Sequence, residues 1–183
     1  RLFESGDHSD LTLTCADGTD FKVHKTVLCS QSSFFANACR PGGFKEAIEG
    51  IVKLEDTETH VVRAMLEYLY SLTYDIGQVE GHHSPIVFHA KMYAAADFLD
   101  IPPLKLFAKK KFQVLSSDNW RTPDYLNALR LAFESTPATD LGLREIAGLT
   151  CAQNFAELLA IDGFTSILSS VPGLGKEISI VLA

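Results

Sequence analysis

The chain has 183 residues, 46% of them apolar, and a formal net charge of −7 at pH 7. This apolar content is too high for a disordered tail, yet no apolar run approaches the roughly 18 to 20 residues that span a bilayer. The acidic balance disfavours a nucleic-acid partner, because such binding draws most of its affinity from Lys and Arg contacts to phosphates. The length allows one substantial core, or one core with a smaller satellite, and therefore one to two domains.

Two short strands are expected near the start of the chain. Residues 9–15 alternate between polar and apolar side chains, which is the period of a half-buried strand. Residues 16–19, Ala-Asp-Gly-Thr, have turn chemistry, and a second alternation begins at Phe21 and Val23. These segments predict a β-hairpin. A third strand is expected at residues 51–54, Ile-Val-Lys-Leu, which are mostly apolar and β-branched.

Helices are expected between and after these strands. Residues 25–30 and 33–39 predict two short helices, the second of which ends before the loop-forming run Arg-Pro-Gly-Gly. A longer helix is expected to begin at Thr57 or Thr59, because the apolar side chains that follow recur at helical spacing. One face of this helix should therefore be buried.

A helix pair is expected next, at residues 86–99 and 104–115, after a loop at residues 75–84. We assign the break between the two helices to Ile-Pro-Pro at residues 101–103, because proline cannot donate a backbone hydrogen bond inside a helix. The strand signal disappears beyond this pair. The remaining sequence predicts helices that begin at Thr122-Pro123, near residue 140 and at residue 164.

The four cysteines indicate neither a metal site nor a disulfide framework. They have no CxxC pair and no histidine at zinc-finger spacing, and we interpret them as small buried hydrophobic residues. They are Cys15, Cys29, Cys39 and Cys151. Such usage suits a reducing compartment, so an intracellular location, cytoplasmic or nuclear, is expected. Residues 1–10 carry acidic side chains where a signal peptide would be apolar.

The order of these elements, together with a set of short motifs, resembles the BTB/POZ fold. The motifs are Ser-Asp-Leu-Thr-Leu at 9–13, Phe-Lys-Val-His-Lys-Thr-Val-Leu at 21–28, Ser30 with Ser33, Phe34 and Phe35, Ile-Val-Lys-Leu at 51–54, Met-Leu-Glu-Tyr-Leu-Tyr-Ser at 65–71, and Ala-Ala-Ala-Asp-Phe-Leu-Asp-Ile-Pro at 94–102. Each motif alone is weak, but as a set they are specific. The resemblance covers roughly residues 9–116.

The resemblance implies an α+β fold, a BTB/POZ-like small β-sheet flanked by helices and followed by an all-helical extension. We expect residues 1–116 to form the BTB/POZ domain and residues 117–183 to form a C-terminal helical extension packed on it. The extension is too apolar to stand alone and is similar to those of fungal BTB proteins. The implied function is protein-protein interaction, as an adaptor for a cullin-type ubiquitin ligase; the alternative is a homo-oligomerising scaffold of a transcription or signalling regulator without ligase binding.

Phe44-Lys45-Glu46 is the candidate partner-binding segment. It resembles the hydrophobe-x-acid motif with which BTB adaptors engage a cullin scaffold. Chemically it would be an exposed apolar anchor beside a charge that sets the register of the partner. The alternative is that Phe44 folds inward over the Gly42-Gly43 loop while Glu46 caps a turn. The residues leave both interpretations open.

Asp10 and Lys25 match an acid and a base that line a charged pocket in the BTB/POZ family. A plain surface pair is the alternative, and such a pair contributes only about 0 to 1 kcal/mol. His24 lies at a junction between strand and helix, where one ring nitrogen can bond to the backbone. We interpret it as a structural residue.

The same resemblance raises the question of dimerisation. Many BTB dimers exchange a helix that precedes the first strand, and here residues 1–6 provide only about one and a half helical turns. Exchange of this helix is therefore in doubt, and pairing through another surface or a monomer is the alternative.

No catalytic constellation is evident, so an enzyme is not expected. Residues 173–176, Gly-Leu-Gly-Lys, lack the glycine and the Ser or Thr that complete a phosphate-binding loop, and we interpret them as a turn between helices. His82, His83 and His89 have no acidic or thiol partner at a fixed spacing. We expect no metal, cofactor, small-molecule substrate, nucleic acid or membrane, and protein partners alone: the chain itself and a cullin scaffold.

Overall fold

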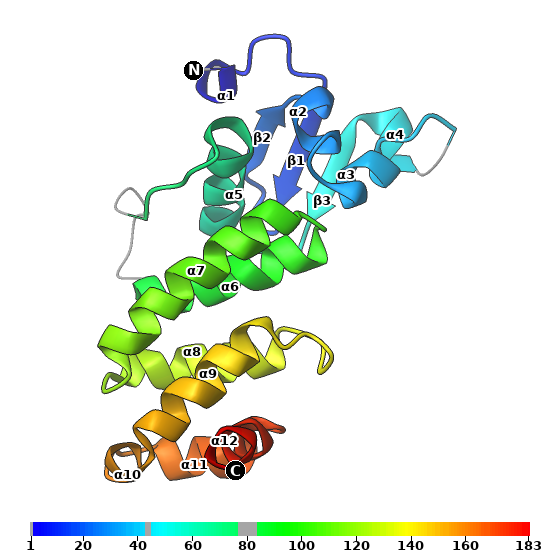
Figure 1. Cartoon of the computed structure of the whole chain (residues 1–183). Helices are drawn as coiled ribbons and strands as arrows, with labels where there is room; N and C mark the ends of the chain where they lie inside the picture. Colours follow the sequence, from blue (N-terminus) through cyan, green and yellow to red (C-terminus); the bar gives the residue numbers. More distant parts are fainter. Residues whose placement is uncertain (1, 43–44, 77–83) are drawn as a thin grey trace. The chain divides into compact units, whose positions relative to one another are not determined.

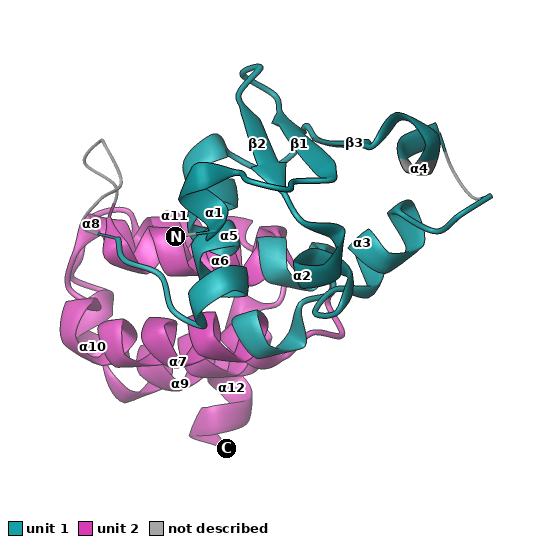
Figure 2. Ribbon diagram, turned by 90° about the horizontal axis from the view of Figure 1, so that it is seen from above, with its two compact units in different colours: residues 1–81, 95–104 teal, residues 82–94, 105–183 magenta. Residues whose placement is uncertain are grey.

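The computed structural model describes residues 2–42, 45–76 and 84–183. The chain divides into two compact units, coloured separately in Figure 2. Unit 1 consists of residues 1–81 and 95–104, and unit 2 consists of residues 82–94 and 105–183. Helices α6 (Pro85–Phe98) and α7 (Pro102–Asn119) each contribute residues to both units.

Unit 1 contains a three-stranded sheet with the order β2-β1-β3 (Figure 1). Strand β1 (Leu11–Cys15) pairs antiparallel with β2 (Asp20–Val23) and parallel with β3 (Ile51–Leu54). All three predicted strands are confirmed. Along β3 the exposed and buried side chains alternate, so one face of the strand is buried and the other is open.

Among the described residues, five helices belong wholly to unit 1. They are α1 (Leu2–Ser5), α2 (Lys25–Cys29), α3 (Ser33–Ala38), α4 (Lys45–Glu49) and α5 (Thr59–Ser71). Helices α2 and α3 contact each other, and both α1 and α2 contact α5. The buried face of α5 has the expected apolar stripe. The helix begins at Thr59, one of the two predicted starts, and its N-cap is Glu58, without a side-chain capping bond.

Helix α4 is a correction to the expectation of a loop between the second short helix and β3. It is only five residues long, and Lys45 and Glu49 form an ion pair one turn apart. A helix this short gives no apolar period that could be read from the sequence. Helices α3 and α4 both lie next to β3 (Figure 1).

The break between α6 and α7 differs from the predicted one. Pro102 and Pro103 lie in the first turn of α7, where their missing N–H groups would have no helical partner in any case. The chain reverses at Asp100, whose φ of 47° lies in the left-handed region. Helix α7 also continues to Asn119, beyond the expected end at residue 115.

Unit 2 contains the remaining helices (Figure 1). They are α8 (Pro123–Glu134), α9 (Gly142–Gln153), α10 (Phe155–Leu158), α11 (Phe164–Ser170) and α12 (Leu174–Leu182). Helix α9 contacts α8, α10 and α12. Gly148 permits the close approach of α12, because a Cβ atom at this position would lie 2.8 Å from Cβ of Glu177. Helix α12 begins directly after Gly173, within the residues that were predicted to form a turn between helices.

Two polar side chains, buried Arg144 and half-buried Asp140, anchor unit 2. The guanidinium of Arg144 donates from Nη2 to the carbonyl oxygens of Phe133 (2.7 Å) and Thr136 (2.8 Å), and so satisfies carbonyls at the C-terminal end of α8. Asp140 accepts from Tyr93 Oη (2.7 Å) and is paired with Lys105 Nζ (2.7 Å). These bonds tie the segment between α8 and α9 to α6 and α7 within the unit.

Candidate functional site

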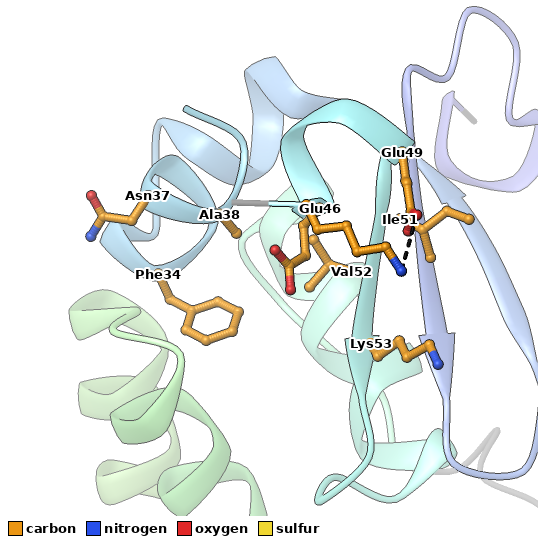
Figure 3. Close-up of a pocket in the computed structure, with 9 residues that line it drawn as sticks. Phe34, Asn37, Ala38, Glu46, Glu49, Ile51, Val52 and Lys53 are labelled. Carbon is orange, nitrogen blue, oxygen red and sulfur yellow. Dashed lines mark ion pairs between the residues drawn. The ribbon is translucent and has the colours of Figure 1, made fainter. Parts of the chain in front are cut away.

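A groove lies between helices α3 and α4 on one side and strand β3 on the other (Figure 3). Its volume is about 570 Å³, and it is lined by residues 34, 37 and 38 of α3, residues 45, 46 and 49 of α4, and residues 51–53 of β3. We call this feature the α3–β3 groove. It lies entirely within unit 1. A volume of this size is in the range of protein sites that bind a ligand or a short segment.

The α3 wall is held in place by Ser32. Its hydroxyl accepts from the N–H of Phe35 (3.1 Å) as the N-cap of α3 and donates to the carbonyl of Leu99 (2.5 Å). Phe34 then points into the groove (Figure 3). Its ring lies 5.6 Å from that of Phe98. Ala38 is the small residue of this wall.

Apolar side chains are exposed around the groove. Phe98 is 60% exposed and Ile48 on α4 is 83% exposed. Ile51 of β3 is 39% exposed and lines the groove itself. Exposed apolar side chains next to a concave surface with a charged rim are typical of a protein-protein interaction site.

The predicted partner-binding segment contributes to this groove. Phe44 lies outside the described residues. Lys45 pairs with Glu49 at 3.2 Å, and because both side chains are exposed this pair stabilises α4 by little. Glu46 lines the groove and, among the described residues, has no ion-pair partner. The role of the segment in partner binding stays a prediction.

Asp10 and Lys25, the predicted charged pocket, meet through the backbone. Oδ1 of Asp10 accepts from the N–H of Lys25 at 2.7 Å, at the first position of α2. Asp10 therefore caps this helix and places a negative charge at its positive end. Whether the pair also serves a partner stays a prediction.

His24 has partners on both ring nitrogens. The Tyr70 hydroxyl accepts from the backbone N–H of His24 (3.0 Å) and lies 2.7 Å from Nδ1, while Nε2 lies 2.8 Å from the carbonyl of Asp7. This arrangement makes Nδ1 the acceptor and Nε2–H the donor. The residue joins β2, α5 and the segment before β1, which fits the expected structural role.

Other candidate ligands do not converge. His82 and His83 lie outside the described residues. His89 is buried, and burial together with Lys111 lowers its pKa to about 4. Within residues 2–42, 45–76 and 84–183, no three metal-ligating side chains form a group. No helix of those ranges is long and apolar enough to cross a bilayer.

The cysteines only partly fit the expectation of buried hydrophobic residues. Cys15 and Cys151 are buried, whereas Cys29 and Cys39 are half-buried. Burial, together with the neighbouring thiol of Cys29, raises the pKa of Cys39 to about 11, so this thiol is protonated at neutral pH. All four are free thiols.

Several residues of the groove were not foreseen. The β-branched run at residues 51–54 predicts the strand, but it does not show that Val52 is buried while Ile51 and Lys53 are exposed, or which helix lies alongside. In the sequence, Phe34 is recognisable only as part of the BTB/POZ motif set. Its position opposite β3 depends on the path of the chain through α4, and the sequence of α4 has no apolar period that predicts a helix.

The described residues form a small α+β domain with a groove between helices α3 and α4 and strand β3. A family model described as the BTB/POZ domain matches residues 1–114. The BTB domain of zebrafish PATZ1 is 16% identical, with a TM-score of 0.47 over 60% of this chain and 80% of that one. The BTB (Tramtrack and Bric a brac) domain of human Gigaxonin is 24% identical, with a TM-score of 0.42 over 60% of this chain and 84% of that one.

No curated protein matches the sequence. The family model covers more than half of the chain, so the chain belongs to the BTB/POZ domain family. Domains of this family are non-catalytic modules of protein-protein interaction. The fold class expected from the sequence is confirmed.

Proposed function

We propose that this chain is an adaptor that holds a cullin-type scaffold of a ubiquitin ligase, with Phe44, Lys45 and Glu46 as part of the contact surface. The observation that carries this proposal is the α3–β3 groove. Glu46 lines the groove and has no ion-pair partner among the described residues, and the side chains of Ile48 and Phe98 are exposed nearby. An apolar anchor beside a charge is the arrangement of an interface hot spot.

The mechanism is recognition without catalysis. Affinity comes from a few apolar side chains that lose contact with water on binding, and the charged rim sets specificity and the rate of association. The partner is a protein, in an intracellular setting. In such a ligase, this chain would bind the cullin scaffold, and a different domain or protein would select the substrate.

Size-exclusion chromatography with light scattering tests this proposal. The chain is analysed alone and mixed with a purified cullin N-terminal region. We expect a complex that Phe44→Ala abolishes and that Val114→Ala leaves intact. Val114 is a suitable control because it is 63% exposed on α7 and lies in unit 2. Circular dichroism establishes that both variants are folded.

Self-association is the alternative function. Helix α1 contacts α5 of its own chain, and the ring of Phe3 lies 5.3 Å from that of Tyr70. This helix is therefore engaged within the chain, and pairing by its exchange would first break these contacts. A dimer that binds no cullin and is unaffected by Phe44→Ala would overturn the adaptor proposal and favour a homo-oligomerising scaffold.

A further inference from the structure

Strand β3 presents a free edge to the α3–β3 groove. It is the outermost strand beside β1, and the N–H of Thr12 donates to the carbonyl of Gly50 at 2.9 Å. In this parallel register Gly50, Val52 and Leu54 face β1, so Ile51 and Lys53 direct their N–H and C=O groups away from the sheet. Among the described residues these groups have no backbone partner.

The groove follows this edge. Ile51, Val52 and Lys53 line one side, and Phe34 and Ala38 of α3 line the other (Figure 3). The open hydrogen-bonding groups match an extended chain, which carries free donors and acceptors at the same spacing. A helix does not match them, because its own backbone groups are already paired.

The charges at the two ends of the groove differ in sign. Glu46 of α4 lies toward the start of β3, and Lys53 lies toward its end. Lys45 and Glu49 pair with each other, whereas Glu46 and Lys53 have no ion-pair partner within the described residues. A segment that runs antiparallel to β3 would therefore meet Lys53 first and Glu46 last.

We propose that the α3–β3 groove binds an extended segment of a partner protein, which adds an antiparallel strand to β3. Opposite Lys53 the segment carries an acidic residue, next an apolar residue toward Phe34, then a β-branched residue opposite Ile51, and finally a basic residue near Glu46. This inference rests on the proposed function in that the groove is an interaction surface. It does not require the partner to be a cullin.

The first test is a titration of the full chain, followed by amide NMR spectra, with the capped peptide Thr-Glu-Val-Ile-Arg-Thr. We expect saturable shifts at the amides of Ile51 and Lys53. N-methylation of the peptide isoleucine removes a donor to β3 and should weaken binding about tenfold. N-methylation of the following arginine, whose N–H points away from β3, should leave the affinity within about twofold.

Protein variants locate the site. Ala38→Phe fills the groove and should weaken peptide binding by more than about tenfold, whereas Ala36→Phe, on an exposed position of the same helix, should leave it unchanged. Lys53→Glu should weaken binding a few-fold, and a peptide with lysine in place of its glutamate should restore it. Thermal denaturation verifies that each variant is folded.

Three outcomes would overturn this inference: no binding at millimolar peptide, shifts confined to another surface, or equal effects of the two N-methyl groups. A cullin complex without peptide binding would remove the strand-addition proposal and leave the adaptor proposal standing. Peptide binding without a cullin complex would support the strand-addition proposal and overturn the adaptor proposal.

Discussion

At the junction of β2 and α2, the Tyr70 hydroxyl serves two atoms of His24. It accepts from the backbone N–H and, by the geometry, donates to Nδ1 at 2.7 Å. Burial raises the pKa of this hydroxyl, so it stays protonated and able to donate. One hydroxyl therefore fixes both the start of α2 and the orientation of the imidazole ring.

Tyr70→Phe should lower the free energy of unfolding by about 1 to 2 kcal/mol, because it leaves the backbone N–H and Nδ1 of His24 without their partner. Urea denaturation measures this loss. In the unchanged chain, nitrogen NMR should show the Nε2–H tautomer of His24, since Nε2 donates to the carbonyl of Asp7. The Nδ1–H tautomer, or a loss of stability below about 0.5 kcal/mol, would contradict the assignment.

The environment of Asp140 lowers the pKa of its carboxyl and thereby makes the stability of the chain depend on pH. Burial alone would raise its pKa, but hydrogen bonds from Lys105, the Gly142 N–H and Tyr93 outweigh burial and hold the pKa below its usual value of 3.8. A carboxyl with a lowered pKa contributes stability above that usual value. The contribution is lost as the pH falls through the lower pKa of the folded state.

Asp140→Asn should therefore lower the free energy of unfolding by about 2 kcal/mol at neutral pH, because bonds to a charged group are weakened or lost. In acid, below pH 3.8, the difference from the unchanged chain should shrink. Urea denaturation at neutral and acid pH measures both effects. Asp162→Asn is the control, because Asp162 is exposed. A constant difference at all pH values would rule out the charge as its origin.

Among the helices, the side-chain caps of α3 and α8 differ in how many partners they bind. Thr122 Oγ1 accepts from the N–H of Tyr125 at 3.3 Å and caps α8, as its sequence predicts. Ser32 caps α3 and is 3% exposed. Its hydroxyl also donates to Leu99, which follows α6, so this serine links two elements that are far apart in the sequence.

Ser32→Ala should therefore destabilise the chain more than Thr122→Ala. We expect a loss of about 1 kcal/mol for the threonine cap and about 2 kcal/mol for the serine, whose removal also leaves a buried carbonyl unpaired. Urea denaturation compares the two variants, and hydrogen exchange should show faster exchange in α3 after Ser32→Ala. Equal losses would mean that the bond to Leu99 contributes nothing.

At the scale of the whole molecule, the compact units do not follow the order of the chain. Residues 82–94 and 105–116 cluster with residues 117–183 in unit 2. The pairs of Asp140 with Tyr93 and Lys105 belong to this cluster. The expected boundary at residue 116 and the packing of the extension on the BTB/POZ domain stay predictions.

Truncation after residue 116 tests this organisation. We expect the shortened chain to be less stable and to bind a hydrophobic dye, because α6 and α7 would lose partners in unit 2 and expose Phe88 and Phe112, which are now buried. Dye fluorescence and urea denaturation are the measurements. A shortened chain that unfolds as cooperatively as the full one, without dye binding, would show that residues 1–116 are self-sufficient.

The strands, most of the helices and the family could be predicted from local sequence patterns. The alternation along residues 11–15 and the β-branched run at residues 51–54 indicate strands, and the Thr122-Pro123 pair indicates a helix start, since these are local properties of the backbone. The motif set sufficed to indicate the BTB/POZ fold. Helices α4 and α12 were missed, because short or glycine-led helices carry little local signal.

The groove could not be predicted from the sequence, because it depends on tertiary contacts. The sequence around Ile51 and Lys53 does not indicate that they line a groove. Phe34, on the opposite side of that groove, is separated from them in the sequence by α4. They line one cavity because β3 pairs with β1 on one side only and α3 stands beyond its free edge. Such a site depends on contacts between segments distant in the chain, and local propensity does not encode these contacts.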